Sequence, residues 1–240
     1  MHLLSKRFLS AFIFMSLPLS VFAFDFWQGE IPLQVGGFGS SQGTAQNINI
    51  QGLIGNQYTV NNNNQGSALG GVGYFIDVWD KDMFQLLFGA NAFYLGQTSV
   101  NGTVVQEQLF TNLAYSYNIQ NTPLYFDAKA KIKTGSEKYN LVVDAGIGPN
   151  FMRTSQYREM PLNSYTLPDN AFAGQNQTVF AATAGVGVRI NNVFGKFPVE
   201  CGYRFFYLGQ GQLQMNNSQL LNTVSTGSSY ANAGICSIIV

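Results

Sequence analysis

Alternation of apolar and polar residues with a period of two constrains this chain more than any other feature. Segment after segment shows it, among them Phe84–Tyr94, Tyr139–Ile147 and Phe180–Ile190. Successive side chains of a β-strand point to opposite faces, so each segment predicts a strand with one apolar face. After the N-terminal region the chain has no run of about 18 apolar residues, the length that a membrane-crossing helix needs. The sequence therefore predicts an all-β protein.

The N-terminus is typical of an export signal. Lys6 and Arg7 precede an apolar stretch from Phe8 to Leu19, and Ala23 follows at a cleavage position that favours small residues. The apolar stretch is too short to span a bilayer, which favours a cleavable Sec-type signal peptide over a membrane anchor. We therefore expect a signal peptide at residues 1–23 and a single mature domain at residues 24–240.

Export and apolar strand faces together indicate the fold class. Strands cross a bilayer only as closed barrels, because every backbone polar group in the hydrocarbon needs an internal partner. Charged residues make up only 10% of the chain, against roughly 25% in an ordinary soluble domain. The sequence thus predicts a closed antiparallel transmembrane β-barrel in the outer membrane of a Gram-negative envelope.

Connection lengths suggest the strand number. Long polar connections alternate with short turns, as in barrels with long outer loops and short periplasmic turns. The long connections that we expect outside the cell are Gln42–Gln65, Gln97–Gln106, Thr154–Gln177 and Gln210–Thr226. Eight strands is the favoured count, and ten is the alternative if Gln46–Gly52 forms a further strand.

The segment around Pro123 bears on this count. Leu113 and Ile119 belong to an apolar face that shifts by one residue after Pro123, where Leu124 and Phe126 continue it. Either a turn here separates two strands, or a bulge kinks one long strand. The pentapeptide FYLGQ occurs at 93–97 and again at 206–210. If both copies end strands of the same direction, the segment is one bulged strand and the count is eight.

Charged residues on the opposite phase are expected to face the lumen. They are Asp127, Lys129, Lys131, Asp144, Arg189, Glu200 and Arg204. Charges removed from water need partners, and the interior of an eight-stranded barrel is just wide enough for side chains. We therefore predict an ion-pair network that fills the lumen, with a narrow polar pore as the alternative.

Cys201 and Cys236 are the only cysteines, and they fall on the last two strands. Export leads to an oxidising compartment where a disulfide can persist. A cross-strand disulfide forms only if the register brings the two Cβ atoms to about 4 Å. The alternative is two small apolar side chains with no bond between them.

The remaining composition excludes several functions. The single histidine, His2, lies in the expected signal, so residues 24–240 lack the imidazole base of most hydrolytic and acyl-transfer enzymes. We expect no enzymatic activity and no catalytic, cofactor or metal site. Removing Lys6 and Arg7 from the twelve basic residues leaves ten against twelve acidic ones, a net charge of −2. That balance argues against nucleic acid as a partner.

Two segments carry a resemblance to a known family. Residues 184–188 (AGVGV) and 202–205 (GYRF), with the signal and the apolar last strand, resemble the opacity-protein/porin-like superfamily of small outer-membrane β-barrels. The resemblance implies eight strands, insertion by the barrel-assembly machinery, contact with outer-membrane lipid and lipopolysaccharide, and roles in envelope integrity, adhesion or host-surface interaction. The chain departs from that family by ending on Val240 rather than on an aromatic residue.

The third long connection is the predicted contact surface. It holds Tyr157, Arg158, Tyr165 and Phe172, and aromatic and Arg residues dominate interface hot spots. We therefore expect a non-enzymatic outer-membrane protein whose outer loops contact a host or surface ligand. A narrow channel or carrier for small solutes is the alternative. A lipid-modifying enzyme is disfavoured by the missing histidine.

Overall fold

The computed structural model describes residues 29–240. The expected signal peptide at residues 1–23 lies outside the described residues, and its boundary stays a prediction. In the described part of the chain, no helix is long and apolar enough to cross a membrane.

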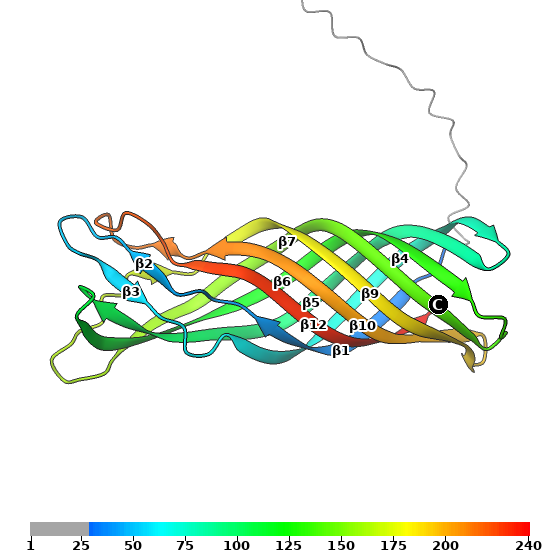
Figure 1. Cartoon of the computed structure of the whole chain (residues 1–240), viewed down its shortest axis with the longest axis horizontal. Coiled ribbons are helices and arrows are strands. Elements are labelled where there is room, and N and C mark those ends of the chain that lie inside the picture. Colours follow the sequence, from blue (N-terminus) through cyan, green and yellow to red (C-terminus); the bar gives the residue numbers. More distant parts are fainter. Residues whose placement is uncertain (1–28) are drawn as a thin grey trace, which may run out of the picture.

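Eight long strands form a closed antiparallel ring (Figure 1). In chain order they are β1 (Pro32–Ser41), β4 (Asn64–Lys81), β5 (Phe84–Gln106), β6 (Phe110–Lys133), β7 (Tyr139–Pro161), β9 (Asn176–Phe194), β10 (Phe197–Gln212) and β12 (Ser225–Ile239). Each strand pairs with the next one in this order, and β12 closes the ring on β1, with Pro32 opposite Ile239. The prediction of an eight-stranded all-β barrel is confirmed.

Four short strands lie outside the ring. They are β2 (Gln46–Ile48), β3 (Asn56–Tyr58), β8 (Phe172–Ala173) and β11 (Gln214–Met215). β2 pairs only with β3, which in turn pairs with the end of β5 through Gln57 and Val105. β8 and β11 form a separate two-stranded sheet. The ten-stranded alternative is therefore wrong, because the strand at residues 46–48 extends the edge of β5 instead of entering the ring.

The two ends of the barrel differ. Short turns join β4 to β5, β6 to β7 and β9 to β10 at one end, on the right in Figure 1, and we call this the short-turn end. The connections between β1 and β4, β5 and β6, β7 and β9, and β10 and β12 lie at the other end, the long-loop end. β2 and β3 lie there, at the left of the picture.

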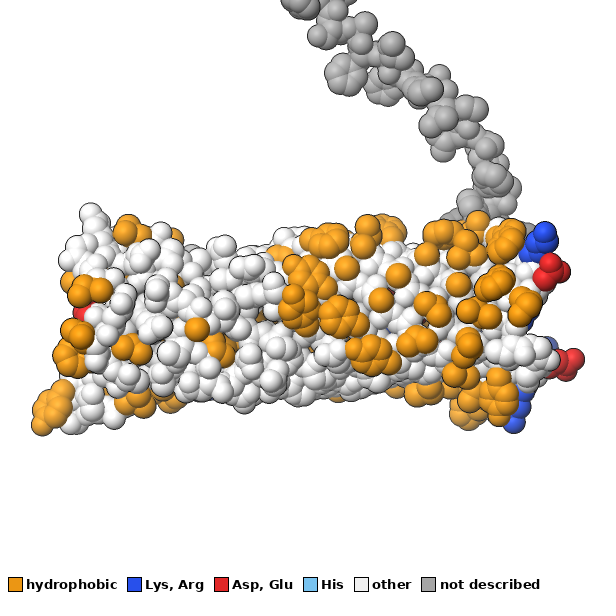
Figure 2. Space-filling view, in the orientation of Figure 1, with side chains coloured by type: hydrophobic (Ala, Val, Ile, Leu, Met, Phe, Trp, Pro, Cys, Tyr) orange, Lys and Arg blue, Asp and Glu red, His pale blue; other side chains and the backbone are white. Residues whose placement is uncertain are grey.

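A belt of exposed apolar side chains surrounds the half of the barrel next to the short turns (Figure 2). Aromatic residues border the belt on both sides: Trp79, Phe84, Tyr139 and Phe197 toward the short turns, and Tyr94, Phe151, Phe180 and Tyr230 on the other border, with the half-buried Tyr207 beside Tyr230. Along β7 the belt runs from Tyr139 to Phe151. At about 3.3 Å per residue and a strand tilt of about 40°, it is about 30 Å tall, the thickness of a hydrocarbon core.

β6 passes through Pro123 without a bulge. Pro123 opposes Asn150, and the β6–β7 register is continuous on both sides of this pair. Ile119 before it and Tyr125 after it are both buried in the interior, so the side-chain phase is unbroken. The one-residue shift of the apolar pattern in the sequence has another cause. Within the belt the apolar residues of β6 face outward, and beyond the belt they face inward. The expected bulge at Pro123 is wrong, and the polarity of the two faces inverts instead.

One of the predicted loops is strand throughout, and another is strand over its first eight residues. Residues 97–106 belong to β5, and residues 154–161 belong to β7. From Phe151 to its end at Pro161, β7 continues about 25 Å past the belt. It stays paired with β6 as far as Pro161, whereas its pairing with β9 ends at Arg153, opposite Asn176. Polar outward side chains made this extension look like loops in the sequence. The structure shows that β5, β6 and β7 extend the wall here as a paired sheet, with β3 added at the β5 edge.

Candidate interaction surface

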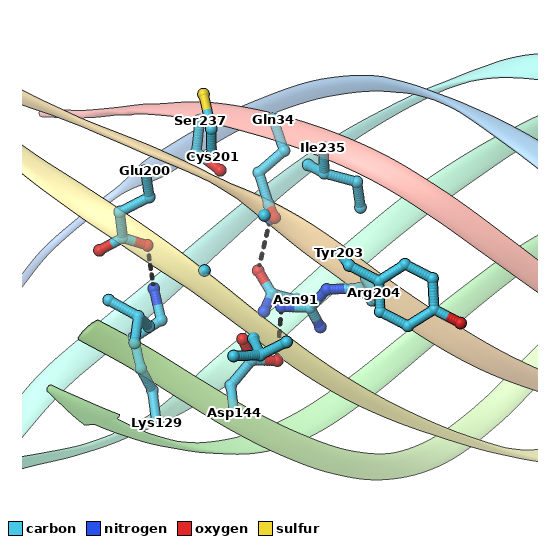
Figure 3. Close-up of a pocket in the computed structure, with 14 residues that line it drawn as sticks. Gln34, Asn91, Lys129, Asp144, Glu200, Cys201, Tyr203, Arg204, Ile235 and Ser237 are labelled. Atoms are coloured by element: carbon cyan, nitrogen blue, oxygen red, sulfur yellow. Dashed lines mark hydrogen bonds and ion pairs between the residues drawn. The ribbon is translucent and has the colours of Figure 1, made fainter.

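The structure places all seven charged residues predicted for the lumen inside the barrel, at the level of the belt. Figure 3 shows four of them together: Lys129, Asp144, Glu200 and Arg204. The seven residues come from β6, β7, β9 and β10 and meet because these strands lie side by side in the ring. Their neighbours in sequence lie on the outward, apolar face of the same strands. Because successive side chains of a strand point to opposite faces, the charged side chains point inward.

Glu200 is shared by two cations. Its Oε2 lies 2.9 Å from Lys129 Nζ, and its Oε1 lies 3.2 Å from Arg189 Nη1. Lys129 Nζ also lies 4.4 Å from the centroid of the Phe75 ring. One carboxylate therefore neutralises charges contributed by β6 and β9.

Glu30 completes the network and was missed in the sequence. Its carboxylate lies 2.7 Å from Lys131 Nζ and 2.8 Å from Arg189 Nη1. Glu30 precedes β1 but shares the parity of the inward-facing Gln34, a signal that could have identified it. With Glu30 included, this network holds four acidic and four basic side chains.

Beside the contacts of Glu200 and Glu30, the network contains a further set of contacts around Arg204 and Asp144. Arg204 Nη2 lies 2.5 Å from Asp144 Oδ1. The Asn91 amide donates to Asp127 and accepts a hydrogen bond from Gln34 Nε2 at 2.8 Å. A cavity of about 40 Å³ lies among these side chains, room for one or two water molecules. Side chains thus fill the lumen at this level.

Apolar side chains occupy the middle of the lumen. Phe93 and Phe206 meet edge to face with ring centroids 5.3 Å apart, and Tyr125 packs 6.1 Å from Phe206. Leu95 and Leu208 are fully buried beside them. This layer separates the ion-pair network from the outer half of the barrel.

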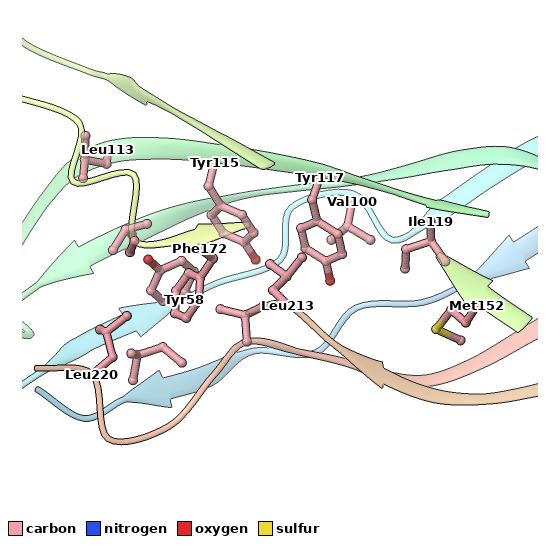
Figure 4. Close-up of a cluster of buried hydrophobic side chains, with 14 residues drawn as sticks. Tyr58, Val100, Leu113, Tyr115, Tyr117, Ile119, Met152, Phe172, Leu213 and Leu220 are labelled. Atoms are coloured by element: carbon pink, nitrogen blue, oxygen red, sulfur yellow. The ribbon is translucent and has the colours of Figure 1, made fainter. Parts of the chain in front are cut away.

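The half of the barrel at the long-loop end contains a larger aromatic cluster (Figure 4). The Tyr58 ring lies 5.0 Å from that of Tyr115 and 5.8 Å from that of Phe172. Burial raises the pKa of the Tyr58 and Tyr117 hydroxyls above the usual range, so both stay neutral. Strands and connections that are far apart in sequence supply these side chains, and together they plug the lumen beyond the belt.

A buried carboxylate anchors this plug. Glu159 accepts backbone N–H hydrogen bonds from Asp169 at 2.6 Å and Asn170 at 2.8 Å, and a hydrogen bond from the Tyr157 hydroxyl. The sequence offered no sign of it. Gln156 adopts a positive φ of 53°, and a register shift beside it changes the side-chain phase before Glu159. Alternation counted from the belt would therefore have placed this carboxylate on the outside.

The four connections at the long-loop end form a hydrogen-bonded ring, which we call the distal ring. Its segments are residues 49–57, 106–112, 160–170 and 214–224. The first and last join through Leu221 N–H to Asn49 O at 2.9 Å, and the first and second through Ile54 N–H to Glu107 at 3.0 Å.

The other two joints close the distal ring. Leu162 N–H donates to Asn112 O at 2.8 Å, which joins the third segment to the second. Asn216 Nδ2 donates to Asn170 O at 3.2 Å, which joins the fourth segment to the third. The outer end of the barrel is thus a connected surface rather than four independent loops.

The predicted contact residues divide into two groups. Phe172 is 2% exposed and packs in the aromatic cluster, and Tyr157 is half-buried against Phe172 and Tyr115. These two do not form an outer contact surface, because alternation and the folded-back connection turn them inward. Arg158 is exposed on the outer wall and Tyr165 is 95% exposed on the distal ring.

Cys201 and Cys236 form a disulfide. They oppose each other directly in the β10–β12 register, with a Cα–Cα distance of 4.1 Å. Both face outward within the belt. Within residues 29–240 no group of three or more His, Cys, Asp and Glu side chains is arranged to hold a metal ion.

An apolar belt of bilayer height, aromatic borders, a polar lumen at belt level and a closed ring together define a class: the protein is a transmembrane β-barrel of eight strands. This architecture agrees with the fold implied by the opacity-protein-like resemblance.

No protein-family model matches the chain, and no curated protein sequence matches it either. Among solved structures the chain is similar to Neisserial surface protein A, with 10% identity over 89% of this chain and 96% of that one and a TM-score of 0.46. It is also similar to the outer membrane protein OprG from Pseudomonas aeruginosa, with 13% identity over 88% of this chain and 93% of that one and a TM-score of 0.46. A third similar structure is the outer membrane protease OmpT from Escherichia coli, with 9% identity over 88% of this chain and 94% of that one and a TM-score of 0.42.

Proposed function

We propose that this protein is a non-enzymatic outer-membrane barrel that presents its distal ring to a surface or partner outside the cell. The observation that carries the proposal is the ring itself, closed by hydrogen bonds between all four outer connections. It stands on a strand extension of about 25 Å beyond the belt. A rigid scaffold that holds exposed connections clear of the membrane suits recognition.

The same geometry supports an orientation and a setting for the barrel. Barrels of this class carry short turns on the periplasmic side and long connections outside. The belt then contacts outer-membrane lipid, the polar wall stands at the level of lipopolysaccharide, and the barrel-assembly machinery inserts the exported chain. Adhesion and envelope integrity are the roles that this arrangement supports.

The packed lumen disfavours the alternative of a channel. Ion pairs, a mid-lumen apolar layer and the outer aromatic cluster occupy it in succession. A continuous water path is needed for conduction, and the cavity in the ion-pair network holds only about 40 Å³. We expect no steady conductance in planar bilayers.

Adhesion with a blocked distal ring tests the proposal. Bacteria that produce the protein are compared with bacteria that lack it, on abiotic surfaces and on cell-derived surfaces. An epitope tag near Asn163 lets an antibody Fab fragment cover the ring, and a tag near Asn192 is the matched control at the short-turn end. We expect adhesion that depends on the protein and is blocked only through Asn163. Equal adhesion with and without the protein would refute the proposal.

A further inference from the structure

Exposed large apolar side chains occupy two separate zones of the barrel (Figure 2). One is the belt. The other is the distal ring, where Leu53, Leu109, Phe110, Tyr165, Leu167 and Leu221 are between 57% and 95% exposed. The wall between the zones is different: residues 97–106, 111–121, 152–158 and 174–179 include no exposed large apolar side chain. The apolar character of the ring is therefore not a continuation of the belt.

The charge of the distal ring narrows the chemistry of its partner. Its four segments contain two acidic residues, Glu107 and Asp169, and no lysine or arginine. Both carboxylates are engaged within the ring: Glu107 accepts from Ile54 N–H at 3.0 Å, and Asp169 accepts from Gln106 Nε2 at 2.8 Å. A surface with two carboxylates and no cationic side chain repels an anionic partner weakly and offers it no charge to pair with.

The distribution of the apolar side chains favours a lipid partner over a protein. They project from all four segments, at Leu53, Leu109, Leu167 and Leu221 among others. Protein hot spots are enriched in Trp, Tyr and Arg seated in fitted pockets, and Tyr165 is the one such residue among the ring segments. A bilayer surface accepts scattered Leu, Ile and Phe side chains without a complementary shape.

We propose that the distal ring docks on a second lipid bilayer with zwitterionic headgroups, and that its apolar side chains enter the boundary between headgroups and acyl chains. The hydrogen-bonded ring keeps these side chains on one surface, so they engage one bilayer together. The proposal rests on the outward orientation given under the proposed function. The proposed function does not specify what the distal ring contacts, and this proposal specifies a lipid bilayer.

Fluorescence quenching tests this directly. The mature chain with Tyr165→Trp is placed in nanodiscs, whose bilayer covers the belt, and is mixed with phosphatidylcholine vesicles that carry brominated acyl chains. The same chain without the substitution gives the background from native tryptophans. We expect quenching of the added tryptophan by the vesicles, and weaker quenching when the vesicles are made of brominated phosphatidylglycerol.

A variant pair then assigns the effect to the ring. Replacing Leu53, Leu109, Leu167 and Leu221 by Asn should weaken vesicle binding about tenfold or more, because the buried apolar area supplies the affinity. Replacing Gln97 and Thr178 on the polar wall by Ser is the matched control and should leave binding unchanged. Heat-modifiable migration on gels verifies that each variant is folded.

Three outcomes would overturn the proposal: no quenching, quenching that persists in the four-Asn variant, or stronger quenching by phosphatidylglycerol. If vesicle binding is absent while the Fab at Asn163 still blocks adhesion, the ring binds a protein or glycan, so this inference is wrong and the proposed function stands. If neither vesicle binding nor adhesion is found, both are wrong.

Discussion

The carboxylate of Glu159 on β7 accepts a hydrogen bond from the backbone N–H of Asn170 at 2.8 Å. This bond ties the connection after β7 to the interior of the barrel, eleven residues from the strand position that holds it. Phe172, two residues further on, is thereby held in the aromatic cluster. One buried side chain links the plug of the outer lumen to the distal ring.

Replacing Glu159 by Gln should loosen this connection. The amide keeps the shape but loses the charge that strengthens its hydrogen bonds. A bond to a charged group is worth about 1.5–3 kcal/mol and a neutral one about 0.5–1.5 kcal/mol, and the variant loses the difference at each bond. Hydrogen exchange at the amides of residues 169–171 should accelerate about tenfold or more. Glu137→Gln, at the short-turn end, is the matched control and should leave these amides unchanged. Unaltered exchange in Glu159→Gln would show that the connection is held by other contacts.

Glu200→Gln should destabilise the barrel more than its polar surroundings suggest. Alternation alone predicts a mild effect, but Glu200 is the ion-pair partner of Lys129. Breaking a buried pair by removing one partner costs about 3–5 kcal/mol. Tyr203→Arg, which puts a charge on the lipid face, should cost about 2–4 kcal/mol. Urea midpoints in lipid vesicles, read by heat-modifiable migration, give the comparison.

Adding Lys129→Gln to Glu200→Gln should recover part of the lost stability, because the uncompensated cation is gone. The double-mutant cycle measures this coupling. Additive losses in the double variant would mean that Lys129 and Glu200 do not interact in the folded barrel.

Removing the disulfide should lower the free energy of unfolding. The bond closes a loop of 35 residues between Cys201 and Cys236, and constraining an unfolded loop of that length is worth about 4 kcal/mol. Cys201→Ala with Cys236→Ala should shift the urea midpoint accordingly. A reducing agent should shift the midpoint of the native chain and leave that of the double variant unchanged. If the reductant has no effect on either protein, the cysteines are not bonded in the folded state.

The third segment of the distal ring should respond to pH. Burial, together with the neighbouring carboxylate of Glu159, raises the pKa of the Asp169 carboxyl above its usual value. A raised folded-state pKa contributes stability below the unfolded value of about 3.9, and this is lost as pH rises through the folded value. Comparison with Asp169→Asn isolates this contribution: relative to that variant, the native chain should gain protection at residues 169–171, corrected for intrinsic exchange, as pH falls through the folded value of Asp169. Asp169→Asn should reduce this pH dependence, and an unchanged profile would assign it elsewhere.

Local sequence patterns determine much of the barrel. Alternation with a period of two predicts strands and places Lys129, Asp144 and Arg204 on one face, and the structure shows that face inside. The same parity extends to Glu30, which sequence reasoning passed over. These features are readable because the geometry of a single strand decides which residues share a face.

Only the tertiary structure decides whether a given face of a strand meets lipid, water or the packed lumen. Ile119 and Tyr125 share the inner face of β6 with Lys129, yet the sequence near Pro123 reads as a phase shift because apolar residues change sides at the border of the belt. Alternation reports which residues lie together, and only the closed ring and the height of the belt show what each face meets. The inward position of Glu159 needs the register shift beside Gln156, and the distal ring needs four connections brought to one end. Both arise from pairing between distant strands, which no local pattern encodes.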